Sequence, residues 1–201
     1  TSYDFSRRHM SIKAWRSEMD DAAEHVILVD QEDREIGTAP KLAVHKTGAL
    51  HRAFSVFGFN RTGEMLLLKR AMTNYHSPGL WANMCCGHPR LGETVMPAAQ
   101  RRSFEELGFR PALSFAFATR YKSSVGSGLI EHEFVHVFGC EINELPKPDP
   151  DEASHVRFAS IDAIVSELEQ HPERFSAWFQ IYVKSYLNQI QMISQRVPAL
   201  V

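Results

Sequence analysis

Short apolar and β-branched runs fill the first two-thirds of the chain, and polar, glycine or proline residues bound them. Runs of this kind are typical of β-strands. They predict strands over residues 25–30, 52–59, 64–70, 114–123 and 131–140. The second and third runs flank residues 60–63, NRTG, whose asparagine and glycine favour a turn. We therefore expect those two strands to form a hairpin.

Apolar residues at helical spacing occur between and after these runs. Pro40 suits the first turn of a short helix, where Lys41 and His45 share one face because they lie four residues apart. A second helix is expected from about residue 94 or 96 to residue 107, ended by a glycine. Residues 161–170 and 175–193 have the same spacing. Strands with flanking helices predict an α/β (α+β) sandwich.

The composition is that of an ordinary globular protein. The chain has 201 residues, of which 44% are hydrophobic and 23% charged, enough for one substantial core. We expect an N-terminal arm over residues 1–24, a single domain over 25–193 and a tail over 194–201. A net charge of -2 provides no general attraction for nucleic acid or an anionic membrane. No apolar run approaches the roughly 18 residues of a membrane-spanning helix.

The three cysteines indicate a reducing compartment. Cys85 and Cys86 are adjacent and Cys140 leaves an odd number, which is a poor basis for disulfides. The first 24 residues carry charges where a signal peptide needs an apolar stretch. We therefore expect a cytoplasmic protein.

Histidines and glutamates mark a candidate metal site. His45, His51 and His88 lie in or beside predicted loops, and Glu131 and Glu133 point to one face of a predicted strand because they are two residues apart. Mixed imidazole and carboxylate ligands suit Mn²⁺, Mg²⁺, Zn²⁺ or Fe²⁺. On spacing alone, solvated histidines and an exposed strand face remain the favoured explanation.

Glutamates on the second helix form another candidate site. The spacing Gly-x5-Glu-x7-Arg-x3-Glu-Glu-x-Gly runs from Gly87 through Glu93, Glu105 and Glu106 to Gly108. It matches a pattern that holds Mg²⁺ against a diphosphate, and the complete spacing is specific. Judged by charge alone, the two adjacent glutamates are equally explained as a surface pair with the neighbouring arginines.

A free cysteine is most often a small buried hydrophobic residue, and this is the role expected of Cys140. Cys85 and Cys86 lie beside candidate metal ligands, where a nearby charge readily changes the pKa of a thiol. For these two residues, a packing role and a chemical role are both open on the residues alone.

The segments WANMCCGHP at 81–89, EHE at 131–133 and FSAW at 175–178 resemble the signatures of type I isopentenyl-diphosphate isomerases, a branch of the Nudix superfamily. The resemblance extends from about residue 25 to about residue 186. It implies a Nudix-like α/β/α sandwich with a mixed sheet. It also implies interconversion of isopentenyl and dimethylallyl diphosphate by protonation and deprotonation, a 1,3-allylic shift in isoprenoid biosynthesis.

The resemblance also implies roles for individual residues. Cys86 corresponds to the catalytic thiol and Glu133 to the second acid/base group, which Tyr121 hydrogen-bonds. One divalent metal (Mn²⁺, Mg²⁺ or Zn²⁺) is expected on His45, His51, His88, Glu131 and Glu133. A Mg²⁺ arriving with the diphosphate is expected at Glu106 and Cys86. Contacts to the substrate are expected from Lys41, Arg70, Arg102 and Trp178, although Trp178 by itself would be explained as a core anchor.

The sequence departs from the family pattern at three positions. Arg102 stands where Nudix hydrolases carry a glutamate, which suits binding a diphosphate better than cleaving it. Asn74 replaces a lysine of the relatives, whose role Lys69 or His76 could take. Ala177 replaces a proline that often precedes the tryptophan.

The implied partner is a small allylic or homoallylic diphosphate, with no nucleic acid and no membrane, on a monomer or weak dimer. Two other functions remain open on the sequence. A Nudix hydrolase would use the helix glutamates and Mg²⁺ to activate water against a nucleoside diphosphate derivative. A binding module would hold a diphosphate without turnover.

Overall fold

The structure is a computed structural model that describes residues 24–74 and 76–196. Residues 1–23 of the expected arm and 197–201 of the expected tail lie outside the described residues, whereas residues 194–196 of the expected tail are helical. The domain boundaries therefore stay a prediction.

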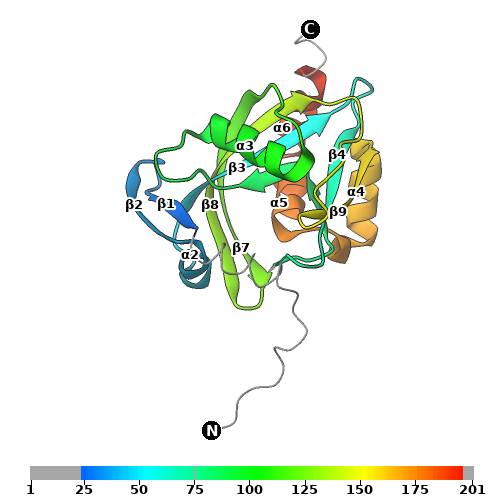
Figure 1. The fold of residues 1–201 in the computed structure, drawn as a ribbon. Helices are drawn as coiled ribbons and strands as arrows, with labels where there is room; N and C mark the ends of the chain where they lie inside the picture. Colours follow the sequence, from blue (N-terminus) through cyan, green and yellow to red (C-terminus); the bar gives the residue numbers. More distant parts are fainter. Residues whose placement is uncertain (1–23, 75, 197–201) are drawn as a thin grey trace.

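Nine strands form one mixed sheet, the central layer in Figure 1. The path β2-β1-β3-β4-β5 forms its main row, while β6 and β8 pair with β3, β7 pairs with β8, and β9 pairs with β4. The strands are β1 (His25–Val29), β2 (Glu35–Pro40), β3 (His51–Phe59), β4 (Met65–Arg70), β5 (Trp81–Asn83), β6 (Cys85–Gly87), β7 (Ser114–Gly126), β8 (Leu129–Glu141) and β9 (Ala153–Ala159).

Strand β3 brings distant segments of the chain together. It pairs in parallel with β8, where His51 faces Glu133, and antiparallel with β6, where Ser55 faces Cys86. Side chains two and four residues apart on a strand point to the same face of the sheet, and paired residues share that face. His51, Glu133, Ser55 and Cys86 therefore point to one face, although they come from three strands.

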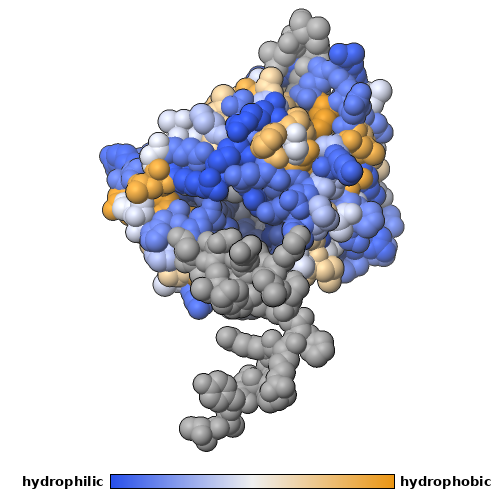
Figure 2. Space-filling model, in the orientation of Figure 1, coloured by the Kyte–Doolittle hydropathy of each residue, from blue (hydrophilic) through white to orange (hydrophobic). Residues whose placement is uncertain are grey.

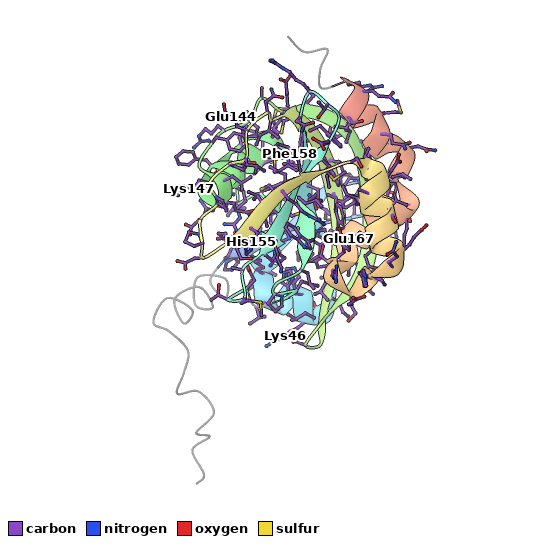
Figure 3. The ribbon with its side chains drawn as sticks, turned by 90° about the vertical axis from the view of Figure 1, so that its right-hand side faces the viewer. Lys46, Glu144, Lys147, His155, Phe158 and Glu167 are labelled. Atoms are coloured by element: carbon purple, nitrogen blue, oxygen red, sulfur yellow. The ribbon has the colours of Figure 1, made fainter. Side chains whose placement is uncertain are left out.

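Helices cover both faces of the sheet (Figure 1). On one face, α4 (Ile161–Gln170), α5 (Ala177–Ser185) and α6 (Leu187–Arg196) pack on a core that includes Phe57 of β3. On the other, α3 (Val95–Leu107) packs on a core that includes Phe54 of the same strand. Figure 3 shows α4, which carries Glu167, beside β9 with His155 and Phe158. The expected α/β/α sandwich with a mixed sheet is confirmed.

The predicted short helix is α2 (Lys41–Thr47). Pro40, expected in its first turn, instead ends β2 and immediately precedes the helix, and Gly48 follows its last residue. Gly48 has a φ of 68°, and a Cβ there would lie 3.1 Å from a methyl group of Ile130. Both the backbone angle and the close neighbour favour glycine. This end therefore fixes α2, and with it His45, against β8.

The expected single helix over residues 175–193 is wrong. The chain forms a 3₁₀ turn at Pro172–Arg174, then α5, then α6. Before α5, the Ser176 N–H donates to the carbonyl of Trp81 at 2.9 Å, and Phe175 forms a parallel bridge with Trp81. Tyr186 separates α5 from α6 with a φ of -131°. The contact with β5 thus precedes the start of α5, and the non-helical Tyr186 separates α5 from α6, although the apolar periodicity of the segment is continuous.

The outer surface is mainly polar. Figure 2 shows a largely hydrophilic face with separate apolar areas. Within the described residues, none of the helices combines the length and the hydropathy needed to cross a membrane.

Candidate metal and acid–base site

Three histidines and one glutamate converge at the end of β3. His45 comes from α2, His51 begins β3, His88 follows β6, and Glu133 lies on β8. One potential ligand atom of each lies within 4.8 Å of all the others. The His88 Nε2 atom is 3.0 Å from Glu133 Oε1, and His51 Nε2 is 3.6 Å from the same oxygen. The structure therefore gathers four of the five residues expected to hold a metal.

The tautomers of two histidines can be derived from their backbone contacts. His45 Nδ1 lies 2.8 Å from the carbonyl of Lys41, and His51 Nδ1 lies 2.9 Å from that of Ala49. A carbonyl oxygen only accepts, so each Nδ1 carries the hydrogen and each neutral ring has its lone pair on Nε2. His51 Nε2 is buried without a hydrogen-bond partner among the described residues. Such an arrangement is typical of imidazoles that bind a metal.

Glu131 lies beside this group of four. Its carboxylate is 3.1 Å from the hydroxyl of Tyr121 and 3.6 Å from His76 Nε2. The same Tyr121 hydroxyl lies 2.6 Å from Glu133 Oε2. Tyr121 therefore links the two glutamates, as the resemblance implies, while the place of Glu131 in the metal site stays a prediction.

Burial and neighbouring charges shift the pKa values of these groups in different directions. Burial lowers the pKa of His45 to about 4, assisted by the charges of His88 and His51. Burial raises the pKa of Glu131 to about 8, and the charge of Glu133 adds to this. Burial also acts to raise the pKa of Glu133, but its interactions with His51 and His88 outweigh it and hold that pKa well below its usual range. In the metal-free protein near neutral pH, His45 is thus a neutral imidazole and Glu133 a carboxylate.

The hydrogen-bond partners of Cys86 are uncharged side chains. Its Sγ is 3.4 Å from the hydroxyl oxygen of Ser55 and within 3.1 Å and 3.3 Å of the amide nitrogen and oxygen of Asn83. Burial raises the pKa of the Cys86 thiol to about 12, although these hydrogen bonds oppose the shift. In the metal-free protein Cys86 is therefore a thiol, whereas Glu133 is a carboxylate.

The other two cysteines lie in the core on the α3 face of the sheet. Cys85 is 1% exposed and Cys140 is 0% exposed, and both pack among apolar side chains. Cys85 and Cys86 are neighbours on β6, so their side chains point to opposite faces. This alternation separates Cys86, on the face with the histidines, from Cys85.

The glutamate-bearing helix α3 holds its arginines in ion pairs. Arg101 binds Glu93 at 2.8 Å, and Arg102 binds Glu106 at 2.7 Å. Arg102 also binds Glu152, just before β9, at 2.7 Å. Burial raises the pKa of Glu106 to about 7, although Arg102 opposes the shift. Arg102 and Glu106, expected to contact the diphosphate and its Mg²⁺, therefore lie side by side.

The remaining expected substrate contacts occupy two places. Lys41 Nζ is 3.0 Å from a carboxylate oxygen of Glu24. The Arg70 guanidinium lies 5.4 Å from the centroid of the Trp178 ring, and the His76 ring lies 5.7 Å from it, edge to face. Trp178 is 3% exposed, and its Nε1 atom has no hydrogen-bond partner within the part of the chain that the structure describes. Trp178 thus combines a packing role with a position beside Arg70.

Several residues around the site carry no sequence signal of their own. Asn83 lies three positions before Cys86 within the WANMCCGHP segment, and this closeness was the one signal that could have identified it as a partner of the thiol. Ser55 and Tyr182 belong to apolar runs, where one hydroxyl does not stand out. Glu152 lies in an acidic connection. Only the pairing of strands and the packing of α5 bring these residues to the site.

Comparisons with solved structures support the fold. A protein of Deinococcus radiodurans, DR0079, superposes with a TM-score of 0.67 at 18% identity, covering 80% of this chain and 98% of that one. A MutT protein from Methanosarcina mazei superposes with a TM-score of 0.57 at 18% identity, covering 70% of this chain and 94% of that one. At these identities the likeness shows the fold alone.

Sequence comparisons are more specific. Residues 49–179 match the family model of the NUDIX domain. The isopentenyl-diphosphate Delta-isomerase of Serratia proteamaculans is 44% identical over 161 residues, which are 80% of this chain and 90% of that protein. The protein of the same name from Streptomyces griseus is 48% identical over 155 residues, 76% of this chain and 78% of its own length. This chain therefore belongs to the isopentenyl-diphosphate Delta-isomerase family of NUDIX-domain proteins.

Proposed function

We propose that this chain interconverts isopentenyl diphosphate and dimethylallyl diphosphate. The observation that carries the proposal is the pairing of a neutral thiol, Cys86, with an ionised carboxylate, Glu133, on one face of the sheet. Together with the family, this pairing favours proton transfer to and from carbon. An acid and a base held at separate positions are what a 1,3-shift of a double bond needs.

The proton balance of the reaction is simple. From isopentenyl diphosphate, one group adds a proton to the terminal CH₂ carbon, and positive charge develops on the tertiary carbon. The other group then removes a proton from the carbon on the far side of the tertiary carbon, two positions from the one that was protonated. The new double bond forms between this carbon and the tertiary carbon. One proton enters and one leaves, so the substrate and product are isomers. The two enzyme groups exchange protonation states, and solvent protons restore them.

The histidine cluster fits a divalent metal. Its donor set is three imidazole nitrogens and a carboxylate oxygen. Glu131, which shares the Tyr121 hydroxyl with Glu133, is proposed as a further ligand. Mn²⁺, Mg²⁺ and Zn²⁺ all accept such ligands. A metal bound there would supply positive charge beside Glu133 and fix the orientation of its carboxylate. Tyr121 holds the other oxygen of Glu133 through a 2.6 Å hydrogen bond.

The diphosphate is proposed to bind near α3. Arg102 and Arg70 supply positive charge, and Glu106, together with Cys86, is the proposed position of the Mg²⁺ that accompanies the substrate. Arg102 stands where a hydrolase would carry a catalytic glutamate, so this helix is suited to grip the diphosphate rather than to activate water. Trp178 offers an aromatic face to the developing cation, an interaction worth about 2 kcal/mol when desolvated. Lys41 is a further proposed contact.

Product analysis tests the proposal directly. Purified protein with Mg²⁺ and Mn²⁺ would be incubated with isopentenyl diphosphate and followed by ³¹P and ¹H NMR. We expect dimethylallyl diphosphate to appear with the diphosphate intact. Release of phosphate without an isomer would instead favour hydrolysis, and binding without any new product would favour a binding module. Action as a monomer or weak dimer in the cytoplasm stays a proposal from the sequence.

A further inference from the structure

A chain of hydrogen bonds extends from helix α5 to the sulfur of Cys86. The hydroxyl of Tyr182 lies 2.9 Å from the Ser55 Oγ atom, and Ser55 Oγ lies 3.4 Å from Cys86 Sγ. Tyr182 is fully buried and Ser55 is 2% exposed, so neither hydroxyl exchanges its partner with bulk solvent. Buried hydroxyl groups keep hydrogen-bond partners inside the protein.

The orientation of Asn83 fixes one end of this chain. Its Nδ2 atom lies 3.1 Å from the backbone carbonyl of Val56 and 3.1 Å from that of Cys85. Carbonyl oxygens only accept, so the two amide hydrogens are directed at these oxygens. The amide oxygen, 3.3 Å from Cys86 Sγ, is thereby left as an acceptor for the thiol hydrogen. Nδ2 is also 3.1 Å from the sulfur, but its hydrogens are already engaged.

Tyr182 fixes the other end. The Tyr182 hydroxyl donates to Ser55 Oγ, so Ser55 is an acceptor in that bond. Because the thiol hydrogen of Cys86 is directed at the Asn83 oxygen, the hydrogen of Ser55 is the one left for the contact with the sulfur. Tyr182 therefore donates to Ser55, Ser55 donates to Cys86, and Cys86 donates to the Asn83 oxygen. Each group donates once, and the order ends on an amide that two backbone carbonyls hold in place.

We propose that Tyr182 is a positioning residue, which orients the Ser55 hydroxyl toward Cys86 and so holds the sulfur ready for proton transfer. Tyr182 does this from α5, the same helix that begins with Ala177 and carries Trp178. Its ring also packs edge to face on Phe57 with a centroid distance of 5.2 Å, which holds the hydroxyl in register with β3. The position of α5 on the sheet is thereby coupled to the orientation of the thiol.

The kinetic part of the test rests on the proposed function. Tyr182→Phe removes one hydroxyl and keeps the ring. We expect kcat to fall by up to about tenfold, since one hydrogen bond is typically worth that much in rate. KM should stay within about twofold, because Tyr182 acts through Ser55 and not on the diphosphate. An unchanged kcat would overturn the proposal.

Tyr186→Phe is the matched control. Tyr186 follows α5, stacks on Phe117 and accepts a hydrogen bond from Thr119, so its hydroxyl is similarly engaged but away from Cys86. We expect its kcat to equal that of the wild type. Thermal unfolding of both variants separates a general loss of stability from a specific effect. Equal losses of kcat in the two variants would contradict a specific role for Tyr182.

A double-mutant cycle tests the route through Ser55. Ser55→Ala removes the hydroxyl that connects Tyr182 with the sulfur. Because Tyr182 acts through that hydroxyl, Tyr182→Phe should cause no further loss of kcat in the Ser55→Ala background. Losses that multiply would show that the two residues act independently and would overturn the proposal.

Thiol alkylation provides a readout that does not need isomerase activity. In a Cys85→Ala/Cys140→Ala background, iodoacetamide reports on Cys86 alone. We expect the alkylation rate constant at one fixed pH to fall in Tyr182→Phe and to stay unchanged in Tyr186→Phe, because only Tyr182 directs a donor to the sulfur. Absence of isomerase activity in the wild type would overturn the proposed function. An unchanged alkylation rate in Tyr182→Phe would overturn this inference.

Discussion

Glu133 and Cys86 lie on the same face of the sheet, but their surroundings differ in kind. Glu133 is surrounded by groups that carry or can carry charge, His51 and His88 among them, and these hold its pKa low. Cys86 is surrounded by neutral hydrogen-bonding groups, and burial raises its pKa to about 12. One protein face thus keeps one acid protonated and another ionised. The surroundings widen the ordinary difference between a thiol and a carboxyl group, and the neighbours of Glu133 offset the burial that raises the pKa of Glu131 to about 8.

The largest expected effect comes from removing either member of the pair. Glu133→Gln and Cys86→Ala should each lower kcat by on the order of 10²–10⁴-fold, the usual contribution of a general acid or base. Steady-state kinetics with isopentenyl diphosphate measures this. If either variant kept wild-type kcat, that residue would have no part in proton transfer.

Loss of the metal should change the surroundings of Glu133 and leave the hydrogen bonds of Cys86 to Ser55 and Asn83 in place. His51→Gln removes a buried ligand, so we expect metal affinity to fall by at least about tenfold. Bound metal should raise the unfolding free energy of the wild type by about 2.7 kcal/mol at a concentration of 100 Kd. Metal analysis and thermal unfolding measure both quantities.

His136→Gln is the control for this experiment. His136 lies on β8, as Glu133 does, but it binds Asp33 at 2.8 Å and is not one of the four clustered residues. Its metal content should match that of the wild type. Equal metal loss in both variants would contradict the assigned site.

The pH dependence of alkylation tests the raised pKa of Cys86. The pKa of Cys86 is raised to about 12, so the thiol is the dominant form at neutral pH and the thiolate fraction grows as pH rises. In metal-free Cys85→Ala/Cys140→Ala protein, the alkylation rate should increase about tenfold per pH unit from pH 7 to 9 without levelling off. A rate that levels off by about pH 9 would show that the pKa of the Cys86 thiol is at or below its ordinary value.

The smallest effect is expected at the adjacent cysteine. Cys85 packs in the core on the α3 face, so Cys85→Ala should change the unfolding free energy by about 1 kcal/mol and leave kcat within about twofold. Chemical denaturation and kinetics measure the two. A loss of kcat as large as that of Cys86→Ala would mean that the two cysteines had been assigned to the wrong faces.

The sequence predicted the parts of the molecule that depend on local pattern. The short helix near Pro40, the hairpin of β3 and β4, and α4 follow from the proline, the turn residues and helical periodicity. The short strands β5 and β6 were not predicted, because three residues give no alternation to recognise. The start of α5 at Ala177 was missed for a different reason, since Phe175 and Ser176 contact the distant strand β5.

The same distinction applies to the site. His45, His51, His88 and Glu133 were named as candidate ligands from their residue types and from the family resemblance, and the structure brings them together. The roles of all the named site residues stay predictions. Ser55, Tyr182 and Glu152 could not be found from the sequence, because strand pairing and helix packing alone bring them to Cys86 and Arg102. Motifs therefore identify groups that react, and the fold identifies groups that orient them.

Deuterium incorporation tests the central claim most directly. Wild-type protein with its metals would convert isopentenyl diphosphate in D₂O, and the product would be examined by mass spectrometry and NMR. We predict dimethylallyl diphosphate that carries solvent deuterium in a methyl group, with no such product from Cys86→Ala. Loss of phosphate from a substrate that acquires no deuterium, or full conversion by Cys86→Ala, would contradict the account.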